Sequence, residues 1–359
     1  MGLPGSEGLP PEPRLVPMFV VSTRSGESGA SSDAAGGIAR FSLQMISVPP
    51  SHEAGIVERP AFGSEEPEKH FALKSRRPLD ERAFYAGLAS HISGRIGPDR
   101  DVLIYTHGFN TSYDEARFRL AQIVADARFG GVAVLYTWPA AGSLLDYEAA
   151  KESATIARDA LSSLLHKLSA VPDVGRIHIL AHSMGAWLAM EALRENALTG
   201  SPDLNGKLGD VMLAAPDIDL SVFRQQLARI DPSHVSILVA ANDRALSLSR
   251  RLAGDRPRLG ALDPGDPKDR AALDQLGVKA YDLTPEATGW IGHATFASAP
   301  QAVRTIGAQL TSKRQDSNTQ AVLGERPVDS NITSSPLAPP NLGAATPAAG
   351  APPMSASPQ

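Results

Sequence analysis

Ser183 has the sequence context of a reactive nucleophile. It follows the apolar run 177–181 and precedes a helical pattern, with Ala181 and Gly185 two positions away on either side. A sharp strand-to-helix turn strains the backbone at such a serine, projects its hydroxyl and tolerates only small residues at these two positions. Glycine is usual at both, and alanine is its smallest substitute. We therefore interpret Ser183 as a nucleophile rather than as a helix N-cap.

A serine nucleophile needs a general base and an acid that orients the base. Asp243 follows the apolar run 235–241, and His293 is the last histidine of the chain, beyond the final strand pattern. Ser, Asp, His is a known chain order for a catalytic triad. Asp217, after the apolar run 211–215, is the second choice for the acid, although Asp-x-Asp before a helix is also a normal N-cap.

The developing oxyanion of acyl transfer needs preorganised N–H donors. Met184, the residue after the nucleophile, offers one backbone amide, and we expect Phe109 to offer the other. Gly108 lets the loop after the strand pattern turn its amides toward the site. A substrate pocket is expected around four residues, although core packing is an equally good interpretation of the tryptophan: His107, Gly108, Trp138 and His182.

These residues require strands that alternate with helices. Apolar periodicity predicts strands at 18–23, 39–48, 70–73, 102–106, 132–136, 177–181, 211–215, 236–241 and 278–283. It predicts helices at 80–92, 114–128, 147–168, 184–196, 223–230 and 300–310. Such alternation is typical of an α/β fold, a mostly parallel twisted sheet with helices on both faces.

Composition divides the chain into three regions. Residues 1–14 are rich in Gly and Pro, and we expect a disordered leader there. Residues 15–312 carry almost all of the periodic pattern and are expected to form one catalytic domain. Residues 313–359 are rich in Pro, Ser and Ala, a composition that buries too little apolar surface to fold, so a disordered tail is expected.

Several classes of protein are disfavoured by composition. The chain has no cysteine, which excludes a disulfide framework, a cysteine-ligated metal and a cysteine nucleophile. The net charge of −5 gives no basic footprint for nucleic acid, and no apolar run approaches membrane-spanning length. His178 and His182 flank the turn at Ser183 rather than sharing a helix face, so no metal is expected. Without a P-loop or a GxGxxG motif, no nucleotide cofactor is expected.

The start of the chain as given shows no apolar signal segment. A cytoplasmic location is therefore expected, and export stays open if the start of a precursor is missing.

Seven segments resemble the α/β-hydrolase superfamily and, within it, a bacterial esterase/lipase-like family of unknown function. They are HGFN at 107–110, YTWPAAG at 136–142, the helix start at 147–154, AHSMG at 181–185, LAAPDID at 213–219, ANDRAL at 241–246 and GHATF at 292–296. The resemblance spans roughly residues 15–312. It implies a Ser–Asp–His hydrolase and favours Asp243 over Asp217. Two positions depart from the family pattern: Ala181 in the elbow, and Ala150 where an acidic residue is usual.

Together these features predict a serine hydrolase, specifically a carboxylesterase that forms an acyl-enzyme. A small or short-chain acyl ester is the expected substrate, because no long apolar insertion could form a lipase lid. Two alternatives stay open: an acyltransferase on the same triad, in which an alcohol or thiol replaces water, and a non-catalytic binding module of the same fold.

Overall fold

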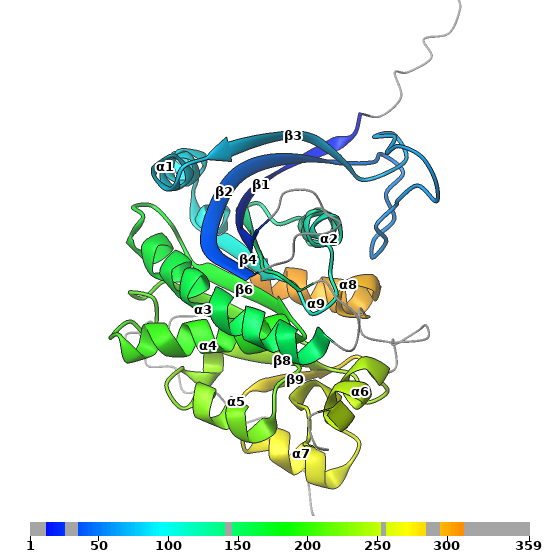
Figure 1. Cartoon of the computed structure of the whole chain (residues 1–359), viewed down its shortest axis with the longest axis vertical. Helices are drawn as coiled ribbons and strands as arrows, with labels where there is room; N and C mark the ends of the chain where they lie inside the picture. Colours follow the sequence, from blue (N-terminus) through cyan, green and yellow to red (C-terminus); the bar gives the residue numbers. More distant parts are fainter. Residues whose placement is uncertain (1–11, 26–34, 141–145, 253–255, 285–294, 312–359) are drawn as a thin grey trace, which may run out of the picture. The chain divides into compact units, whose positions relative to one another are not determined.

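The computed structural model describes residues 12–25, 35–140, 146–252, 256–284 and 295–311 (Figure 1). The predicted leader up to residue 11, the predicted base His293 and the predicted tail from residue 312 lie outside them. Within the described residues one sheet has the strand order β3-β2-β1-β5-β4-β6-β7-β8-β9. The strands are β1 (Arg14–Arg24), β2 (Ala35–Val48), β3 (Ala72–Leu79), β4 (Val102–Thr106), β5 (Val132–Thr137), β6 (Ile177–His182), β7 (Leu208–Ala214), β8 (Val235–Val239) and β9 (Lys279–Asp282).

The sheet combines an antiparallel edge with a parallel body. β2 pairs antiparallel with β1 and β3, and these strands are long and strongly curved in Figure 1. From β1 across to β9 every neighbouring pair is parallel. The predicted α/β fold with a mostly parallel sheet is therefore confirmed.

The order of the strands reverses at β4. The chain passes from β4 to β5 on one side and then returns to β6 on the other side of β4. Ligand sites in open parallel sheets form at such a reversal, outside the carboxyl ends of the strands. The loop that begins at His107 and the turn at Ser183 leave the carboxyl ends of these two adjacent strands.

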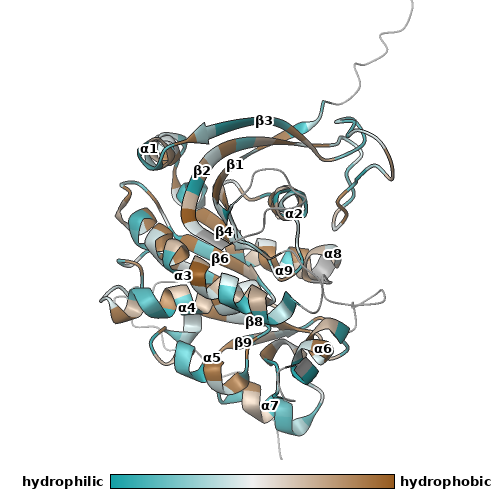
Figure 2. Ribbon diagram, in the orientation of Figure 1, coloured by the Kyte–Doolittle hydropathy of each residue, from teal (hydrophilic) through white to brown (hydrophobic). Residues whose placement is uncertain are grey.

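Helices bury both faces of the sheet. One core joins α1 (Glu81–Ile92), α3 (Tyr147–Ala170), α4 (Met184–Leu198) and α5 (Leu220–Leu227) to one face. The second core joins α2 (Tyr113–Asp126) and α9 (Pro300–Thr311) to the other. Every residue of β4, β5, β6 and β8 is buried, which explains why these strands are mostly apolar. In Figure 2, α3 and α7 (Pro267–Asp274) carry hydrophilic residues among hydrophobic ones, as amphipathic surface helices do.

Four elements differ from the sequence prediction. The strand expected at 70–73 is β3, which starts at Ala72 and continues through exposed polar residues to Leu79. Helices α6 (Arg244–Leu252) and α7 were not predicted, and neither was the single turn of α8 (Thr295–Ser298). β3 is an edge strand with one paired side, so it tolerates polar residues and Pro78 where a central strand would not.

Candidate active site

Ser183 lies at the junction of β6 and α4 in a strained backbone conformation. Its φ is 54° and its ψ is −122°. Only a few per cent of residues other than glycine have positive φ, and such strain is concentrated at functional sites. The surrounding backbone holds the turn: the N–H of Ser183 donates to the carbonyl of Ala214 at 2.9 Å, and the N–H of Asp217 donates to the carbonyl of Ser183 at 3.2 Å.

The neighbours of Ser183 must be small because the loop after β4 packs directly on the turn. A Cβ added to Gly185 would lie 2.3 Å from the carbonyl oxygen of His107, and one added to Gly108 would lie 2.9 Å from the Cβ of Ser183. Ala181 is fully buried. The close approach explains the glycine at 185, and it brings the two predicted oxyanion segments into contact.

A buried hydrogen-bond network supports the loop from below. The His107 ring donates from Nδ1 to the carbonyl of Gly108 at 2.9 Å, and Trp138 donates through its Nε1 to the carbonyl of His107 at 3.0 Å. Arg24 reaches from β1 to the Oγ1 of Thr137 at 2.8 Å and to the Nε2 of His107 at 3.2 Å. The imidazole of His107, at the end of β4, is thus surrounded by residues from the ends of β1 and β5.

Burial first, and the charge of Arg24 second, lower the pKa of His107 to about 3. The ring is therefore neutral, which matches its donor role at Nδ1 and its acceptor role at Nε2. His107 and Trp138 are both 0% exposed, and their rings stack with centroids 5.6 Å apart. The structure thus places Trp138 in the core, one of its two interpretations, and His107 beneath the loop rather than on an open pocket wall.

Two backbone amides at this junction lack a partner. Within the described residues the N–H groups of Phe109 and Met184 form no hydrogen bond. The first amides of a helix have no acceptor inside it, which accounts for Met184. Both amides belong to the segments that meet at Ser183, as the sequence predicted for the oxyanion donors.

Asp243, the first choice for the acid, lies between β8 and α6. It is 0% exposed, and its Oδ1 accepts from the amides of Ala245 at 2.9 Å and Leu246 at 3.0 Å. Two N–H donors thus fix the orientation of the carboxylate. The position of His293 relative to this carboxylate lies outside the described residues.

Asp217, the second choice, is held by side chains. Its carboxylate accepts from the hydroxyl of Tyr147 at 2.7 Å and from that of Ser249 at 2.6 Å, and it forms an ion pair with Arg258 at 3.2 Å. Burial, and then the charge of Asp217, raise the pKa of Tyr147, so this hydroxyl stays a donor. A carboxylate held by two hydroxyl groups and a buried guanidinium has the surroundings of a structural residue. Sequence analysis did not predict these three partners.

His182 precedes the nucleophile and is 9% exposed. Its ring stacks on Phe296 of α8, with centroids 4.6 Å apart and an interplanar angle of 29°. Gly108 touches the same ring, because a Cβ added there would lie 3.0 Å from the Nδ1 of His182. His182 therefore connects the turn at Ser183 to the short helix that follows the His293 segment.

A cavity of about 270 Å³ opens beside the turn. It is lined by Glu148, Lys151, Trp187, Asp217, Asp219, Val222, Arg256 and Arg258. Asp217, whose amide donates to Ser183, forms part of its wall. Of the lining residues the sequence had singled out only Asp217 and its neighbour Asp219. The charged residues at 256 and 258 lie in a polar stretch without a motif.

The described residues contain no group of three or more His, Asp or Glu side chains arranged to ligate a metal ion. Among the helices in the same ranges, none has the length and apolar character needed to cross a lipid bilayer.

Several solved structures share part of the chain's architecture at low sequence identity. Carboxyl esterase 2 from the fungus Tuber melanosporum is 15% identical, with a TM-score of 0.36 over 60% of this chain and 78% of its own. A putative hydrolase from Agrobacterium vitis S4 is 12% identical, with a TM-score of 0.35 over 83% of this chain and 97% of its own. A cutinase-like protein from Cryptococcus sp. is 15% identical, with a TM-score of 0.32 over 58% and 92%.

No curated protein sequence matches the chain. One sequence family does, and its match covers residues 81–314, which is more than half of the 359 residues and includes both sides of the Ser183 turn. The chain therefore belongs to the family described as alpha/beta hydrolase of unknown function (DUF900).

Proposed function

We propose that this protein is a serine hydrolase, specifically a carboxylesterase for small or short-chain acyl esters. The observation that carries the proposal is the strained backbone of Ser183, held at positive φ between β6 and α4. A residue other than glycine keeps such a conformation only where its surroundings impose it. Two amides beside the serine, those of Phe109 and Met184, also have no hydrogen-bond partner among the residues that the structure describes. This combination suits acyl transfer.

In the proposed mechanism His293 removes the proton from the Oγ of Ser183 while that oxygen attacks the ester carbonyl carbon. The amides of Phe109 and Met184 donate to the oxyanion that forms. The tetrahedral intermediate collapses as the imidazolium of His293 protonates the leaving alcohol. A water molecule, activated by the same imidazole, then releases the acid from the acyl-enzyme. Asp243 orients the imidazole and stabilises its charge.

The choice of Asp243 as the acid is supported by the different environments of the two candidates. Asp217 is occupied by two hydroxyl groups and a guanidinium, so its carboxylate is already neutralised. Asp243 is oriented by two backbone amides at the start of α6. A buried carboxylate that N–H donors fix after a parallel strand is suited to orient an imidazole.

The proposed size of the substrate is supported by the cavity beside the turn. Its volume of about 270 Å³ is below the range of about 300–1,000 Å³ typical of drug-sized ligands. A short acyl chain fits in a cavity of this volume, whereas a long fatty acyl chain would extend beyond it.

A labelling experiment tests the proposal. The wild type and Ser183→Ala are treated with a fluorophosphonate probe and then assayed on 4-nitrophenyl esters of increasing chain length. We expect the wild type to be labelled and to favour short chains, and the variant to lose both activities. Folded wild type that takes no label would contradict the enzyme hypothesis, and label retained by the variant would contradict the choice of Ser183. Product analysis with added alcohols distinguishes hydrolysis from acyl transfer.

A further inference from the structure

The cavity beside Ser183 has an unusual charge arrangement. Its lining includes three cationic side chains, those of Lys151, Arg256 and Arg258, and three carboxylates. Glu148, Asp217 and Asp219 supply the carboxylates, so the formal charge of the lining is zero. Although the net charge is zero, a charged side chain without a partner would still offer hydrogen-bond donors or acceptors to a ligand.

Most of these charges do have partners. Arg258 forms its ion pair with Asp217 at 3.2 Å, and Lys151 lies 3.9 Å from Glu148. The Oδ1 of Asp219 accepts from two amides at the start of α5, at 2.9 and 3.1 Å. Arg256 is the exception: it is exposed and has no carboxylate, carbonyl or ring partner within the described residues. The cavity therefore presents one guanidinium with unused donors.

Two segments of the cavity wall are joined to the turn at Ser183. Trp187, on the cavity wall, is four residues after Ser183 on α4, which is about 6 Å along a helix axis. Asp217, also on the wall, donates its amide to the carbonyl of Ser183 at 3.2 Å. Both segments of the wall are thus joined directly to the residue that would hold the acyl group.

We propose that the cavity binds a carboxylate on the acyl chain of the substrate, with Arg256 as the residue that determines this specificity. The inference rests on the proposed function. A guanidinium binds a carboxylate through two parallel N–H···O bonds, while Trp187 and Val222 pack on the few carbons between the carboxylate and the scissile carbonyl. A monoanion is favoured over a dianionic phosphate, because three carboxylates share the lining. The substrate class is then the half-ester of a short dicarboxylic acid.

A pair of matched esters tests this inference. Mono(4-nitrophenyl) succinate carries the carboxylate, and methyl 4-nitrophenyl succinate replaces it with a neutral methyl ester. We expect the wild type to prefer the anionic ester in kcat/KM. Arg256→Ala should lose about 10–100-fold on that ester, as expected for a charge-assisted hydrogen bond, and change less than about twofold on the neutral one. Arg256→Lys should recover part of the loss.

The control variant is Arg270→Ala, which removes an exposed arginine of α7 that is not part of the cavity lining. It should behave as the wild type on both esters. Thermal unfolding midpoints of the variants verify that each is folded. A second measurement uses glutarate, which should protect the wild type from the fluorophosphonate probe better than glutaramide does, and should not protect Arg256→Ala.

The outcomes separate the two proposals. Hydrolysis of the neutral ester with no preference for the anionic one, or an equal effect of Arg256→Ala on both, overturns the carboxylate site and leaves the serine hydrolase standing. Equal protection by glutarate and glutaramide overturns it as well. Absence of any labelling or hydrolysis by folded protein overturns the proposed function, and the carboxylate site with it.

Discussion

At the scale of single residues, Gly185 shows how little space the turn at Ser183 leaves. An added Cβ at this glycine would lie 2.3 Å from a backbone carbonyl, which no rotation of a side chain can relieve. The loop that carries Phe109 would therefore have to move away from the nucleophile. Preorganised donors lose their effect when they are displaced from the position of the oxyanion.

We expect Gly185→Ala to abolish most of the esterase activity and to lower the free energy of unfolding by about 1–3 kcal/mol, the usual cost of overpacking. Gly87→Ala is the matched control, because its Cβ would meet only the ring of Phe19 at 3.4 Å, an ordinary contact. Alanine is also favoured over glycine inside α1. Urea unfolding and ester kinetics of both variants check this, and equal activity of the two would contradict it.

Substitution of Asp243 should reduce the catalytic rate, whereas substitution of Asp217 should reduce stability. Asp243→Asn should reduce kcat by orders of magnitude with a small change in stability, because the amide keeps its N-cap acceptor. Asp217→Asn leaves Arg258 buried without its counter-charge, so it should lower the free energy of unfolding by about 3–5 kcal/mol. Its kcat per folded molecule should stay near that of the wild type. The reverse pattern would make Asp217 the acid.

Residue types and local spacing were enough to predict the tight turn at Ser183 and the need for a small residue at 185, because these residues are neighbours in the sequence. The partners that hold them could not be predicted in the same way. Arg24 and Thr137 are 113 positions apart, and Tyr147 and Asp217 are 70 apart. Such contacts depend on strand order, and the sequence carries no local signal for it.

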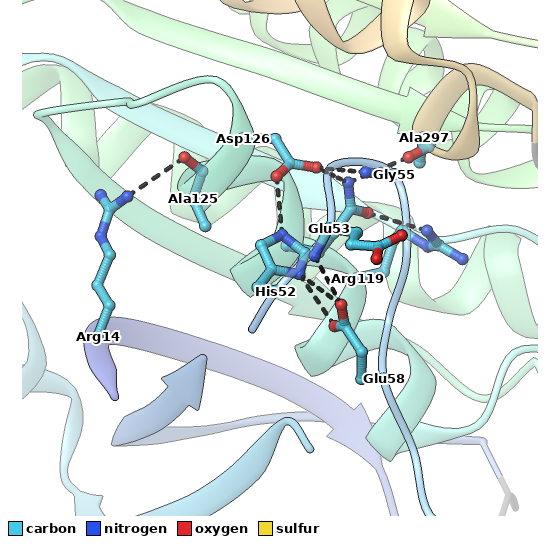
Figure 3. Close-up of polar contacts among 10 residues, drawn as sticks. Arg14, His52, Glu53, Gly55, Glu58, Arg119, Ala125, Asp126 and Ala297 are labelled. Carbon is cyan, nitrogen blue, oxygen red and sulfur yellow. Dashed lines mark hydrogen bonds and ion pairs between the residues drawn. The ribbon is translucent and has the colours of Figure 1, made fainter. Parts of the chain in front are cut away.

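At the scale of elements, a half-buried charge cluster joins the loop between β2 and β3 to α2 (Figure 3). His52 lies between two carboxylates, with its Nδ1 2.9 Å from Glu58 and its Nε2 2.8 Å from Asp126. Asp126 also accepts from the amide of Gly55 at 2.8 Å. A Cβ on Gly55 would lie 2.4 Å from the carbonyl oxygen of Ser298, so the loop also rests on α8.

This cluster should make stability depend on pH. Burial lowers the pKa of His52, but the hydrogen bonds and charges of Asp126 and Glu58 outweigh burial and raise it above its ordinary value of 6.5. The stabilisation by the imidazolium is thus complete below pH 6.5 and is lost as the pH rises through the raised pKa. For Asp126, burial raises the pKa, but the hydrogen bond from His52 and others lower it overall, so its contribution is lost as the pH falls through that lowered pKa.

We therefore expect the free energy of unfolding to fall as the pH rises above 6.5, and to fall less in His52→Gln than in the wild type. Part of the decline should persist, because Asp101 and Asp210 likewise raise the pKa of the buried His178 against the effect of its burial. Urea denaturation at several pH values measures both curves. Parallel curves would show that His52 is not protonated in the folded protein.

The elements themselves differ in how well their sequences specify them. Val102–Thr106 was predicted with the correct bounds because all five residues are buried and apolar or small. The edge strand β3 was misplaced because its exposed residues share no such pattern. Helix α7 did have a usable signal: Asp266 caps it and Pro267 occupies its first turn. The apolar periodicity of its eight residues is too weak to predict a helix unless the cap and the proline are considered as well.

At the scale of the whole molecule, the folded unit is larger than the segment matched by the family. The family match begins at residue 81, after β1, β2 and β3. β1 nevertheless pairs with β5 along five residues and contributes Met18, Phe19, Val20 and Val21 to both cores at 0–1% exposure. It also supplies Arg24, which supports His107. The antiparallel edge is thus part of the core and of the site.

Two fragments test this arrangement. Fragment 81–359 keeps the whole family match but exposes the edge of β5 and the apolar residues that β1 covered, so we expect it to aggregate or to unfold without cooperativity. Fragment 12–311 removes residues 1–11 and 312–359, which include the predicted tail and most of the predicted leader, but keeps β1 to β9. We expect its thermal midpoint to stay within about 2 °C of that of the full chain, since no buried contact of the described core is lost, and its rate of fluorophosphonate labelling to be unchanged. If fragment 81–359 were soluble, unfolded cooperatively and took label at the full rate, β1–β3 would be an accessory layer, and the support of His107 by Arg24 would be dispensable.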